Sequence, residues 1–329
     1  MEKNNSDISR REFIIRSIKA GSAIVVTGTI AAILYDSKGP QVKEKQDIIK
    51  LPDYTIKPIK GKTISIVKGK KRSQTLQKAF DLLGGLSRFI VKGDKVLIKP
   101  NIAFATSPTL GATTHPEIIT TMIDLCFKAG ASKVSILDNP INDPASCYLL
   151  TGIEDAVKNT KADLILPKEN LFRNMTLKNG KLIKNWPLLY KPLIESTKVI
   201  GLAPIKNHHR SGASMSMKNW YGLLGGRRNV FHQDINTIVT ELAMMIRPTL
   251  VVLDGFDVMM TNGPTGGSIS DLKQKNTIIV STDQVAADTV GAGLLNLKSK
   301  DLPYLSMAER AGVGSTNYKN LKPILFNEA

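Results

Sequence analysis

The sequence predicts an α/β fold, with a mainly parallel sheet flanked by helices and a small β-hairpin insertion. From residue 63 onward, short aliphatic runs alternate with stretches that have apolar residues at helical spacing, which is typical of βαβ units. The runs are apolar at consecutive positions, as strands covered on both faces are. The pair Asn179-Gly180 supplies the positive φ that a tight hairpin turn requires.

The expected strands are rich in Val, Ile and Leu and are bounded by polar residues or glycine. They lie at 63–67, 95–99, 134–137, 163–166, 199–202, 250–253 and 277–280. The expected helices lie at 75–89, 116–129, 152–159, 236–246 and 284–297. The hairpin is expected at 175–183, within an insertion at about 170–190. Together these elements predict a single α/β domain over residues 63–329.

Residues 1–36 have the features of a twin-arginine export signal. The pair Arg10-Arg11 precedes Phe13, and a mildly hydrophobic stretch over 20–35 follows. This stretch is shorter than the roughly 20 residues that a membrane-spanning helix needs. The alternative is a basic amphipathic helix at the start of a cytosolic protein.

The signal predicts a partner and a destination. We expect export by the twin-arginine translocation machinery to the periplasm or the outer face of the cytoplasmic membrane. No small-residue cleavage site is obvious before Asp36, so anchoring to the membrane through an uncleaved N-terminus is an open alternative. Residues 37–62 are rich in Lys, Pro and Asp and are expected to form a linker.

The charge of the chain indicates which ligands it attracts. The net charge is +17, with Lys and Arg spread along the sequence, which favours anionic partners. A lysine-rich surface without any ligand would give the same count. The sequence contains no helix-turn-helix, zinc-finger or RNA-binding aromatic motif, so we expect no nucleic acid partner.

Polar side chains follow three of the expected strands. Lys99 and Asn101 lie at the end of the strand 95–99, Asp138 follows the strand 134–137, and Asp254 follows the strand 250–253. Ligands of open α/β sheets bind at the carboxyl ends of the strands. The three strand ends therefore predict a shared polar cavity.

The histidines indicate where the chemistry lies. Of the four in the chain, His208, His209 and His232 fall between residues 206 and 232, which favours one shared site. Neutral imidazoles together with Asp254 would suit a divalent metal. Alternatively, the imidazoles would move protons while lysines hold an anion. The spacing matches no standard metal motif, so both alternatives stay open.

Basic and glycine-rich segments close to these histidines are candidates for binding the anion. Lys206 and Lys218 would hold it as point charges, and Arg227 and Arg228 would grip a carboxylate or phosphate bidentately. A second glycine-rich loop, 261–267, contains Asn262-Gly263 and would form a lid or an anion cradle. Its alternative is an ordinary surface loop, since it lacks the Gly-Lys-Ser/Thr of a P-loop.

Several motifs resemble those of the bacterial and archaeal domain-of-unknown-function family 362. They are Lys99-Pro100-Asn101, Ser211-Gly212-Ala213-Ser214, Lys218-Asn219-Trp220-Tyr221-Gly222, His232, Asp254, Asn262-Gly263-Pro264 and Ala287-Asp288. The resemblance extends from about residue 64 to the end of the chain. It implies no particular reaction, and it suits an exported subset with a twin-arginine leader.

Many members of this family carry a ferredoxin-like segment with cysteine-ligated iron–sulfur clusters. The two cysteines here, Cys126 and Cys147, form no C-x-x-C pair. We therefore expect no iron–sulfur cluster ligated by this chain.

We expect an enzyme that acts on a small anionic substrate, with metal assistance as one alternative. The expected catalytic residues are His208, His232 and Asp254. The expected substrate-binding residues are Lys99, Asn101, Lys206, Lys218, Asn219, Arg227, Arg228, Asn262 and Gly263. A non-catalytic solute- or cofactor-binding protein and a redox accessory subunit are the alternatives.

Overall fold

The computed structural model describes residues 10–34, 51–56 and 61–328. The chain divides into two units, residues 1–45 and 46–329. The first unit contains helix α1 (Arg10–Leu34), which begins at the two arginines of the predicted signal. No helix within the described ranges is long and apolar enough to cross a membrane. Residues 1–9 and most of the predicted linker lie outside the described residues.

The second unit is built on a mostly parallel, mixed sheet, as the sequence predicts. Among the described residues, nine strands form it, and the path β11-β1-β10-β9-β7-β2-β3-β4 carries β8 as a side branch on β7. Its strands are β1 (Ile64–Lys68), β2 (Lys95–Lys99), β3 (Lys133–Leu137), β4 (Asp163–Ile165), β7 (Lys198–His208), β8 (Gly212–Ser214), β9 (Leu250–Met259), β10 (Leu272–Ser281) and β11 (Ile324–Asn327). Strands β9, β7, β2, β3 and β4 are mutually parallel, whereas β10 runs antiparallel to both of its neighbours.

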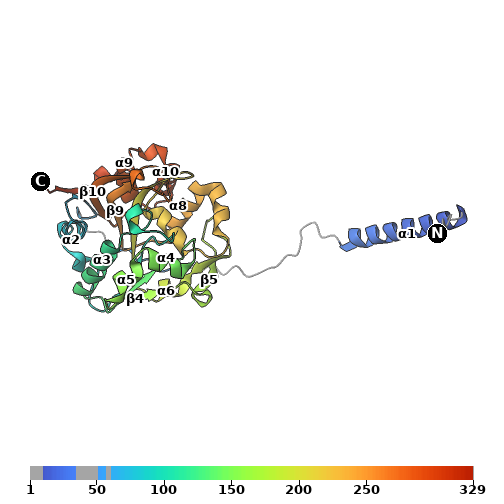
Figure 1. The fold of residues 1–329 in the computed structure, drawn as a ribbon, viewed down its shortest axis with the longest axis horizontal. Coiled ribbons are helices and arrows are strands. Elements are labelled where there is room, and N and C mark those ends of the chain that lie inside the picture. The colour runs from blue at the N-terminus through green and yellow to red at the C-terminus, as the bar shows by residue number, and fades with distance from the viewer. Residues whose placement is uncertain (1–9, 35–50, 57–60, 329) are drawn as a thin grey trace, which may run out of the picture. The chain divides into compact units, whose positions relative to one another are not determined.

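Helices cover both faces of this sheet (Figure 1). One face carries α2 (Arg72–Leu82), α3 (Pro116–Lys128), α4 (Pro144–Leu150) and α5 (Ile153–Lys158). The other carries α6 (Tyr190–Ile194), α7 (Ser216–Asn219), α8 (Ile235–Met245), α9 (Gln284–Leu294) and α10 (Pro303–Arg310). Each face has its own buried apolar cluster. Because the central strands are covered on both sides, they read as continuous apolar runs in the sequence.

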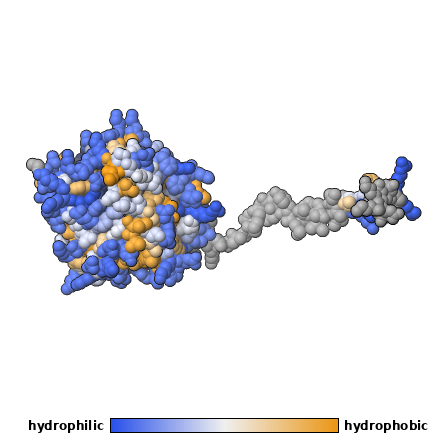
Figure 2. All heavy atoms as spheres, viewed as in Figure 1, coloured by the Kyte–Doolittle hydropathy of each residue, from blue (hydrophilic) through white to orange (hydrophobic). Residues whose placement is uncertain are grey.

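The surface of this unit is mainly hydrophilic. On the face shown in Figure 2, hydrophilic side chains surround a central area where apolar residues reach the surface. A surplus of exposed charge of one sign keeps such a domain dispersed in water and attracts counter-ions.

Three strands are longer than the sequence predicts, and one of them is β10, which already begins at Leu272. Strand β7 continues to His208 because β8 pairs with its last residues, and β9 continues to Met259 because β10 pairs with it along its length. The prediction that Asp254 follows the end of a strand is therefore wrong, since Asp254 lies in the middle of β9. The expected helix at 75–89 ends earlier, at Leu82, because Gly84 and Gly85 adopt positive φ angles of 96° and 86°.

The insertion forms the small antiparallel sheet of β5 (Phe172–Met175) and β6 (Trp186–Leu189). Asn179 has the expected positive φ, 64°, but the paired strands lie outside the predicted hairpin range. The intervening loop instead folds over the buried carboxylate of Glu241, which accepts hydrogen bonds from the backbone N–H groups of Lys181, Leu182 and Ile183. The loop is therefore larger than a two-residue turn.

The last part of the predicted linker packs on the second unit. Tyr54 is only 2% exposed, and its hydroxyl donates to the carbonyl oxygen of Leu193 at 2.9 Å. Its backbone N–H donates to the carbonyl oxygen of Arg247 at 3.1 Å. Residues 51–56 therefore belong structurally to the second unit, which starts before residue 63.

Candidate functional site

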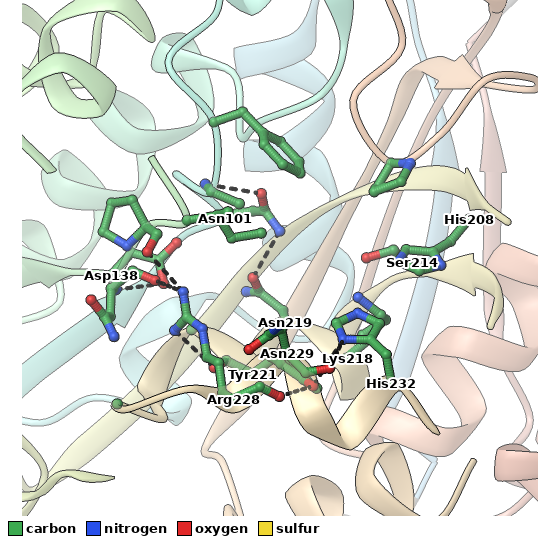
Figure 3. Close-up of a pocket in the computed structure, with 18 of the residues that line it drawn as sticks. Asn101, Asp138, His208, Ser214, Lys218, Asn219, Tyr221, Arg228, Asn229 and His232 are labelled. Atoms are coloured by element: carbon green, nitrogen blue, oxygen red, sulfur yellow. Dashed lines mark hydrogen bonds between the residues drawn. The ribbon is translucent and has the colours of Figure 1, made fainter. Parts of the chain in front are cut away.

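A cavity of about 1140 Å³ opens where strands β2, β3 and β7 end (Figure 3). This position agrees with the general rule for ligand sites in open α/β sheets. Its polar lining includes Lys99, Asn101, Asp138, Lys206, His208, His209, Ser214, Lys218, Asn219, Tyr221, Arg228 and His232. Its apolar wall includes Phe104, Ile141, Phe172 and Val230. Most of the residues predicted for the site thus meet in one place.

A buried ion pair forms the floor of the cavity. Nζ of Lys99 lies 2.6 Å from Oδ1 of Asp138, and the two side chains are 1% and 2% exposed. The same ammonium donates to the carbonyl oxygen of Pro100 at 2.7 Å and to Oδ1 of Asn219 at 3.0 Å. All three of its donors are therefore engaged. Lys99 shapes the floor and has no donor left for a ligand.

Gly222 is required by this ion pair. A Cβ atom at Gly222 would lie 1.9 Å from Oδ1 of Asp138 and 2.6 Å from Nζ of Lys99. The carbonyl oxygen of Gly222 also accepts a hydrogen bond from the backbone N–H of Asn139 at 2.9 Å. The glycine that closes the Lys218–Gly222 motif is thus explained by the close approach of its backbone to the buried ion pair.

Asn219 joins two strands rather than facing a ligand. Its Nδ2 donates to the carbonyl oxygens of Lys99 in β2 and Leu202 in β7, both at 3.1 Å. Its Oδ1 accepts from Lys99 and, at 3.3 Å, from Nδ2 of Asn101. Asn101 and Asn219, two of the three asparagines predicted to bind substrate, therefore hold the cavity wall together.

Arg228 clamps two loops at the cavity edge. Its Nη1 donates to the carbonyl oxygens of Tyr221 and Leu224, and its Nη2 donates to those of Asn139 and Pro140, at distances of 2.6 to 3.2 Å. The terminal donors expected to grip an anion bidentately are thus bound to backbone. Arg227, the second arginine expected to grip the anion, does not line the cavity.

With Lys99 and Arg228 engaged, Lys206, Lys218 and the exposed Arg210 are the cations of the cavity that remain for a ligand. Lys206 is 1% exposed, donates to the carbonyl oxygen of Ala112, and lies with Nζ 5.2 Å from the ring centre of Phe104. Burial, followed by the charges of Lys218 and Lys99, lowers the pKa of Lys206 to about 7. A bound anion would favour the charged form of both lysines.

Three imidazole rings form a stack along one wall. The ring centres of His208 and His209 lie 5.0 Å apart, those of His208 and His232 lie 6.0 Å apart, and both ring pairs are inclined by 13°. The grouping of three histidines between residues 206 and 232 therefore reflects a true spatial cluster. Figure 3 shows His208 and His232 beside Lys218.

Hydrogen bonds assign the tautomer of His208. Its Nδ1 accepts from the backbone N–H groups of Arg210 at 3.1 Å and Ser211 at 3.3 Å. An accepting Nδ1 carries no hydrogen, so Nε2 carries it. Burial, followed by the charge of Lys218, lowers the pKa of His208 to about 2. The ring is therefore neutral at pH 7 and donates through Nε2.

His232 has the opposite tautomer. Its Nδ1 lies 3.2 Å from the hydroxyl of Tyr221 and 3.2 Å from the carbonyl oxygen of Asn229. The single hydrogen of the Tyr221 hydroxyl is donated to the carbonyl oxygen of Arg228 at 2.7 Å. Nδ1 of His232 must therefore donate, which leaves Nε2 with a free lone pair. Burial, followed by the charge of Lys218, lowers the pKa of His232 and keeps that lone pair free.

Asp254 lies away from the histidine stack. Its Oδ2 is 3.0 Å from Nε of Arg72, at the start of α2, and Nη2 of Arg72 is 2.8 Å from Oδ2 of Asp257. Asp254 does not line the cavity. Over the described part of the chain, no three His, Cys, Asp or Glu side chains are arranged to hold a metal ion.

The loop with Asn262 and Gly263 supports the stack from outside. The carbonyl oxygen of Gly263 lies 3.3 Å from Nδ1 of His209, and Nδ2 of Asn262 donates to Oδ1 of Asp271 at 2.6 Å. A Cβ atom at Gly263 would lie 1.8 Å from the carbonyl oxygen of Asn207. Neither residue lines the cavity, although Pro264 does.

The family model of the domain of unknown function DUF362 matches residues 96–293, which is more than half of the chain. The chain belongs to this family. The matched range contains the floor of the cavity, the histidine stack and the Lys218–Gly222 motif. The resemblance inferred from those motifs is thereby confirmed.

Two known proteins are similar to this DUF362 protein. Over 258 residues it is 25% identical to the Thylakoid-associated protein sll1697 of Synechocystis sp., covering 74% of this chain and 75% of that protein. Among solved structures it is similar to the lactate racemase apoprotein of Thermoanaerobacterium thermosaccharolyticum, at 13% identity and a TM-score of 0.41. That match covers 74% of this chain and 58% of the racemase chain. Neither similarity assigns a reaction to this chain.

Two functional residues of this DUF362 domain are missing from the sequence-based site. Tyr221 fixes the tautomer of His232, and its position inside the Lys218–Gly222 motif was the available signal. Asp288 is fully buried and accepts from the backbone N–H groups of Ser216 and Met217 at 2.8 and 3.1 Å. Burial raises the pKa of Asp288 to about 7. Asp288 thereby fixes the turn that carries Lys218 into the cavity.

Proposed function

We propose that this DUF362 domain binds a small anionic molecule in the cavity and moves a proton to or from it. His232 is the base, through the free lone pair of Nε2, and His208 donates a hydrogen bond through Nε2–H to the ligand atom that gains negative charge, as a neutral imidazole can. The observation that carries the proposal is the pair of opposite tautomers on two stacked rings that line one cavity. A neutral base that can take a proton and a neutral N–H that can hydrogen-bond to the charge left behind are suited to proton abstraction from a bound ligand.

The charges of the cavity support an anionic ligand. The positive charge of Lys99 is cancelled by Asp138, and Arg228 is bound to backbone carbonyls. Lys206 and Lys218 have no carboxylate partner among the described residues. A ligand with one or two negative charges would supply the missing partner, in a site where partial desolvation strengthens the attraction.

The binding step is tested by calorimetric titration of the full chain with sulfate, phosphate and small carboxylates. Lys206→Met should weaken the affinity for sulfate at pH 6.5 about tenfold or more, because it removes one of the two lysine charges proposed to hold the ligand. The matched control is Lys133→Met, which removes the same charge from a side chain that is half exposed in β3. Equal affinities of Lys206→Met and Lys133→Met for sulfate would count against the proposal.

The proton-transfer step is tested with His232→Gln. This variant should bind the anion as the parent chain does but lose turnover on a panel of small carboxylates and phosphates, since glutamine cannot accept a proton. A chain that binds anions tightly but turns over none of them would instead be a non-catalytic solute- or cofactor-binding protein. A redox accessory subunit would copurify with a cluster-bearing partner from its host, because both cysteines of this chain are buried and free.

We also propose that the chain is exported by the twin-arginine translocation machinery and works in the periplasm or at the outer face of the cytoplasmic membrane. Support comes from Arg10 and Arg11, which are exposed at the start of α1. Replacing both by lysine keeps the charge but should retain the chain in the cytoplasm. Fractionation of the host cell measures this, and shows whether α1 remains attached as an anchor. Unchanged export of the double variant would refute the proposal.

A further inference from the structure

Five cationic side chains line the cavity; Arg210 is exposed, and the other four differ in what engages them. The ammonium of Lys99 makes three polar contacts, Arg228 makes four, and Lys206 donates to a backbone carbonyl. The amine of Lys218 makes no hydrogen bond or ion pair with any residue that the structure describes. Its nearest recorded partner is the ring of Tyr221, with Nζ 5.3 Å from the ring centre.

The backbone on both sides of Lys218 is firmly held. Asp288 accepts from the backbone N–H groups of Ser216 and Met217, just before it. Just after it, Asn219 binds the carbonyl oxygens of β2 and β7, and Nε1 of Trp220 donates to Oε1 of Gln284 at 2.7 Å. Lys218 is thus a fixed residue with a free amine, which is the usual arrangement of a reacting group rather than of a structural one.

The surroundings of this amine favour its neutral form. Burial, followed by the charges of Arg228 and Lys99, lowers the pKa of Lys218 to about 8. At pH 7 about a tenth of such amines are neutral, against less than about 0.1% for an ordinary lysine. A cationic neighbourhood of this kind is a known way to activate a lysine as a nucleophile.

We propose that Lys218 forms an imine with the carbonyl carbon of a small oxo acid. This inference rests on the proposed function, since it makes the bound anion a carboxylate that carries a carbonyl group. Lys206 would face the carboxylate, and the amine of Lys218 would face the carbonyl. The apolar wall of Phe104, Ile141 and Val230 leaves room for an aliphatic substituent.

The reaction balances with the groups present. The neutral amine of Lys218 adds to the carbonyl carbon, and the C–N bond forms as the C=O bond opens. Nε2 of His232 takes one proton from the nitrogen and, as the imidazolium, gives it to the oxygen, which yields a carbinolamine whose oxygen accepts a hydrogen bond from Nε2–H of His208. A second transfer of the same kind, from the nitrogen through His232 to the hydroxyl group, lets the oxygen leave as water while the C=N bond forms. Each transfer leaves His232 neutral again, and His208 keeps its hydrogen throughout. The net change is amine plus carbonyl to imine plus water, with no oxidation or reduction.

Reductive trapping tests this inference. The full chain is incubated at pH 7 with pyruvate, glyoxylate or 2-oxobutyrate in the presence of cyanoborohydride, which converts an imine into a stable secondary amine. Intact-mass measurement and peptide mapping then count and locate the adducts. We expect one dominant adduct per chain, at Lys218. It should be lost in Lys218→Arg, retained in Lys133→Met, and suppressed by excess sulfate.

The possible outcomes separate this inference from the proposed function. Adducts spread over surface lysines with no preference for Lys218, for all three oxo acids, would overturn the inference. If calorimetry still showed anion binding that depends on Lys206, the proposed function would stand without it. If neither binding nor trapping occurred, both would fail. Peptide mapping of the adduct in the chain without substitutions shows whether Lys218 is the modified residue, even if Lys218→Arg folds poorly.

Discussion

The hydroxyl of Tyr221 lies 3.2 Å from Nδ1 of His232 and donates its own hydrogen to the carbonyl oxygen of Arg228, 2.7 Å away. This relationship fixes which nitrogen of His232 carries the proton. A tyrosine in the Lys218–Gly222 motif thereby controls a histidine that lies a whole loop away in the sequence. The same loop is clamped by the guanidinium of Arg228.

Replacing Tyr221 by phenylalanine should allow His232 to populate both of its neutral tautomers. Only the carbonyl oxygen of Asn229 would remain as an acceptor for Nδ1–H, and the carbonyl oxygen of Arg228 would lose its donor. We expect the free energy of unfolding to fall by about 1 kcal/mol, the value of a typical buried hydrogen bond. We also expect imidazole ¹⁵N spectra to show a mixture of His232 tautomers. An unchanged His232 spectrum in this variant would contradict the assignment.

Replacing Gly222 by alanine should destabilise the domain strongly. The new methyl group would collide with Oδ1 of Asp138 and force apart a buried ion pair, so we expect a loss of about 3 kcal/mol or more on chemical denaturation. Gly293→Ala is the matched control, because a Cβ atom there meets nothing within 4 Å and the site lies in helix α9. It should be neutral or stabilise the domain by up to about 1 kcal/mol. Similar losses in the two variants would refute this explanation of Gly222.

Anion binding should weaken as the pH rises. Burial lowers the pKa of Lys206 to about 7 and that of Lys218 to about 8, so both charges are present at pH 6 and are lost as the pH passes through 7 and 8. Sulfate keeps its charge over this range and is the appropriate probe. We expect its affinity, measured by calorimetry, to fall at least about tenfold between pH 6 and pH 9. An affinity that stays constant or rises would show that these lysines do not hold the anion.

Asp254→Asn should affect stability but not binding. It removes one partner of the buried Arg72 while Asp257 remains, and we expect the free energy of unfolding to fall by about 2–4 kcal/mol. Sulfate affinity should be unchanged, because Asp254 lies outside the cavity lining. Loss of sulfate binding in a folded Asp254→Asn chain would show that Asp254 does contribute to the anion site.

The sequence predicts the position of the site correctly where several polar or ionisable residues lie close together in one short segment. The strand end at Lys99 and the close spacing of His208, His209 and His232 both lead to the cavity, because carboxyl ends of parallel strands meet at one edge of a sheet. Asp254 was misplaced because the end of an apolar run does not mark the end of a strand. Pairing with β10 extends β9 past that point.

The roles of the polar residues were harder to predict than their positions. Lys99, Asn219 and Arg228 lie at the cavity, yet their donors are satisfied by Asp138 and by backbone carbonyls. Such satisfaction depends on long-range contacts that no local pattern records. That the amine of Lys218 has no hydrogen-bond or ion-pair partner among the described residues becomes visible only when the contacts of the surrounding side chains are known.

The tautomers of His208 and His232 can be measured directly by ¹⁵N NMR of the full chain labelled at its histidines, at pH 7. Four histidines are present, and the spectra of His208→Gln and His232→Gln assign the two signals that matter. We predict a neutral His208 protonated at Nε2 and a neutral His232 protonated at Nδ1. Two rings with the same tautomer, or two rings that are both charged, would contradict the pairing of a base with a hydrogen-bond donor on which the proposed function depends.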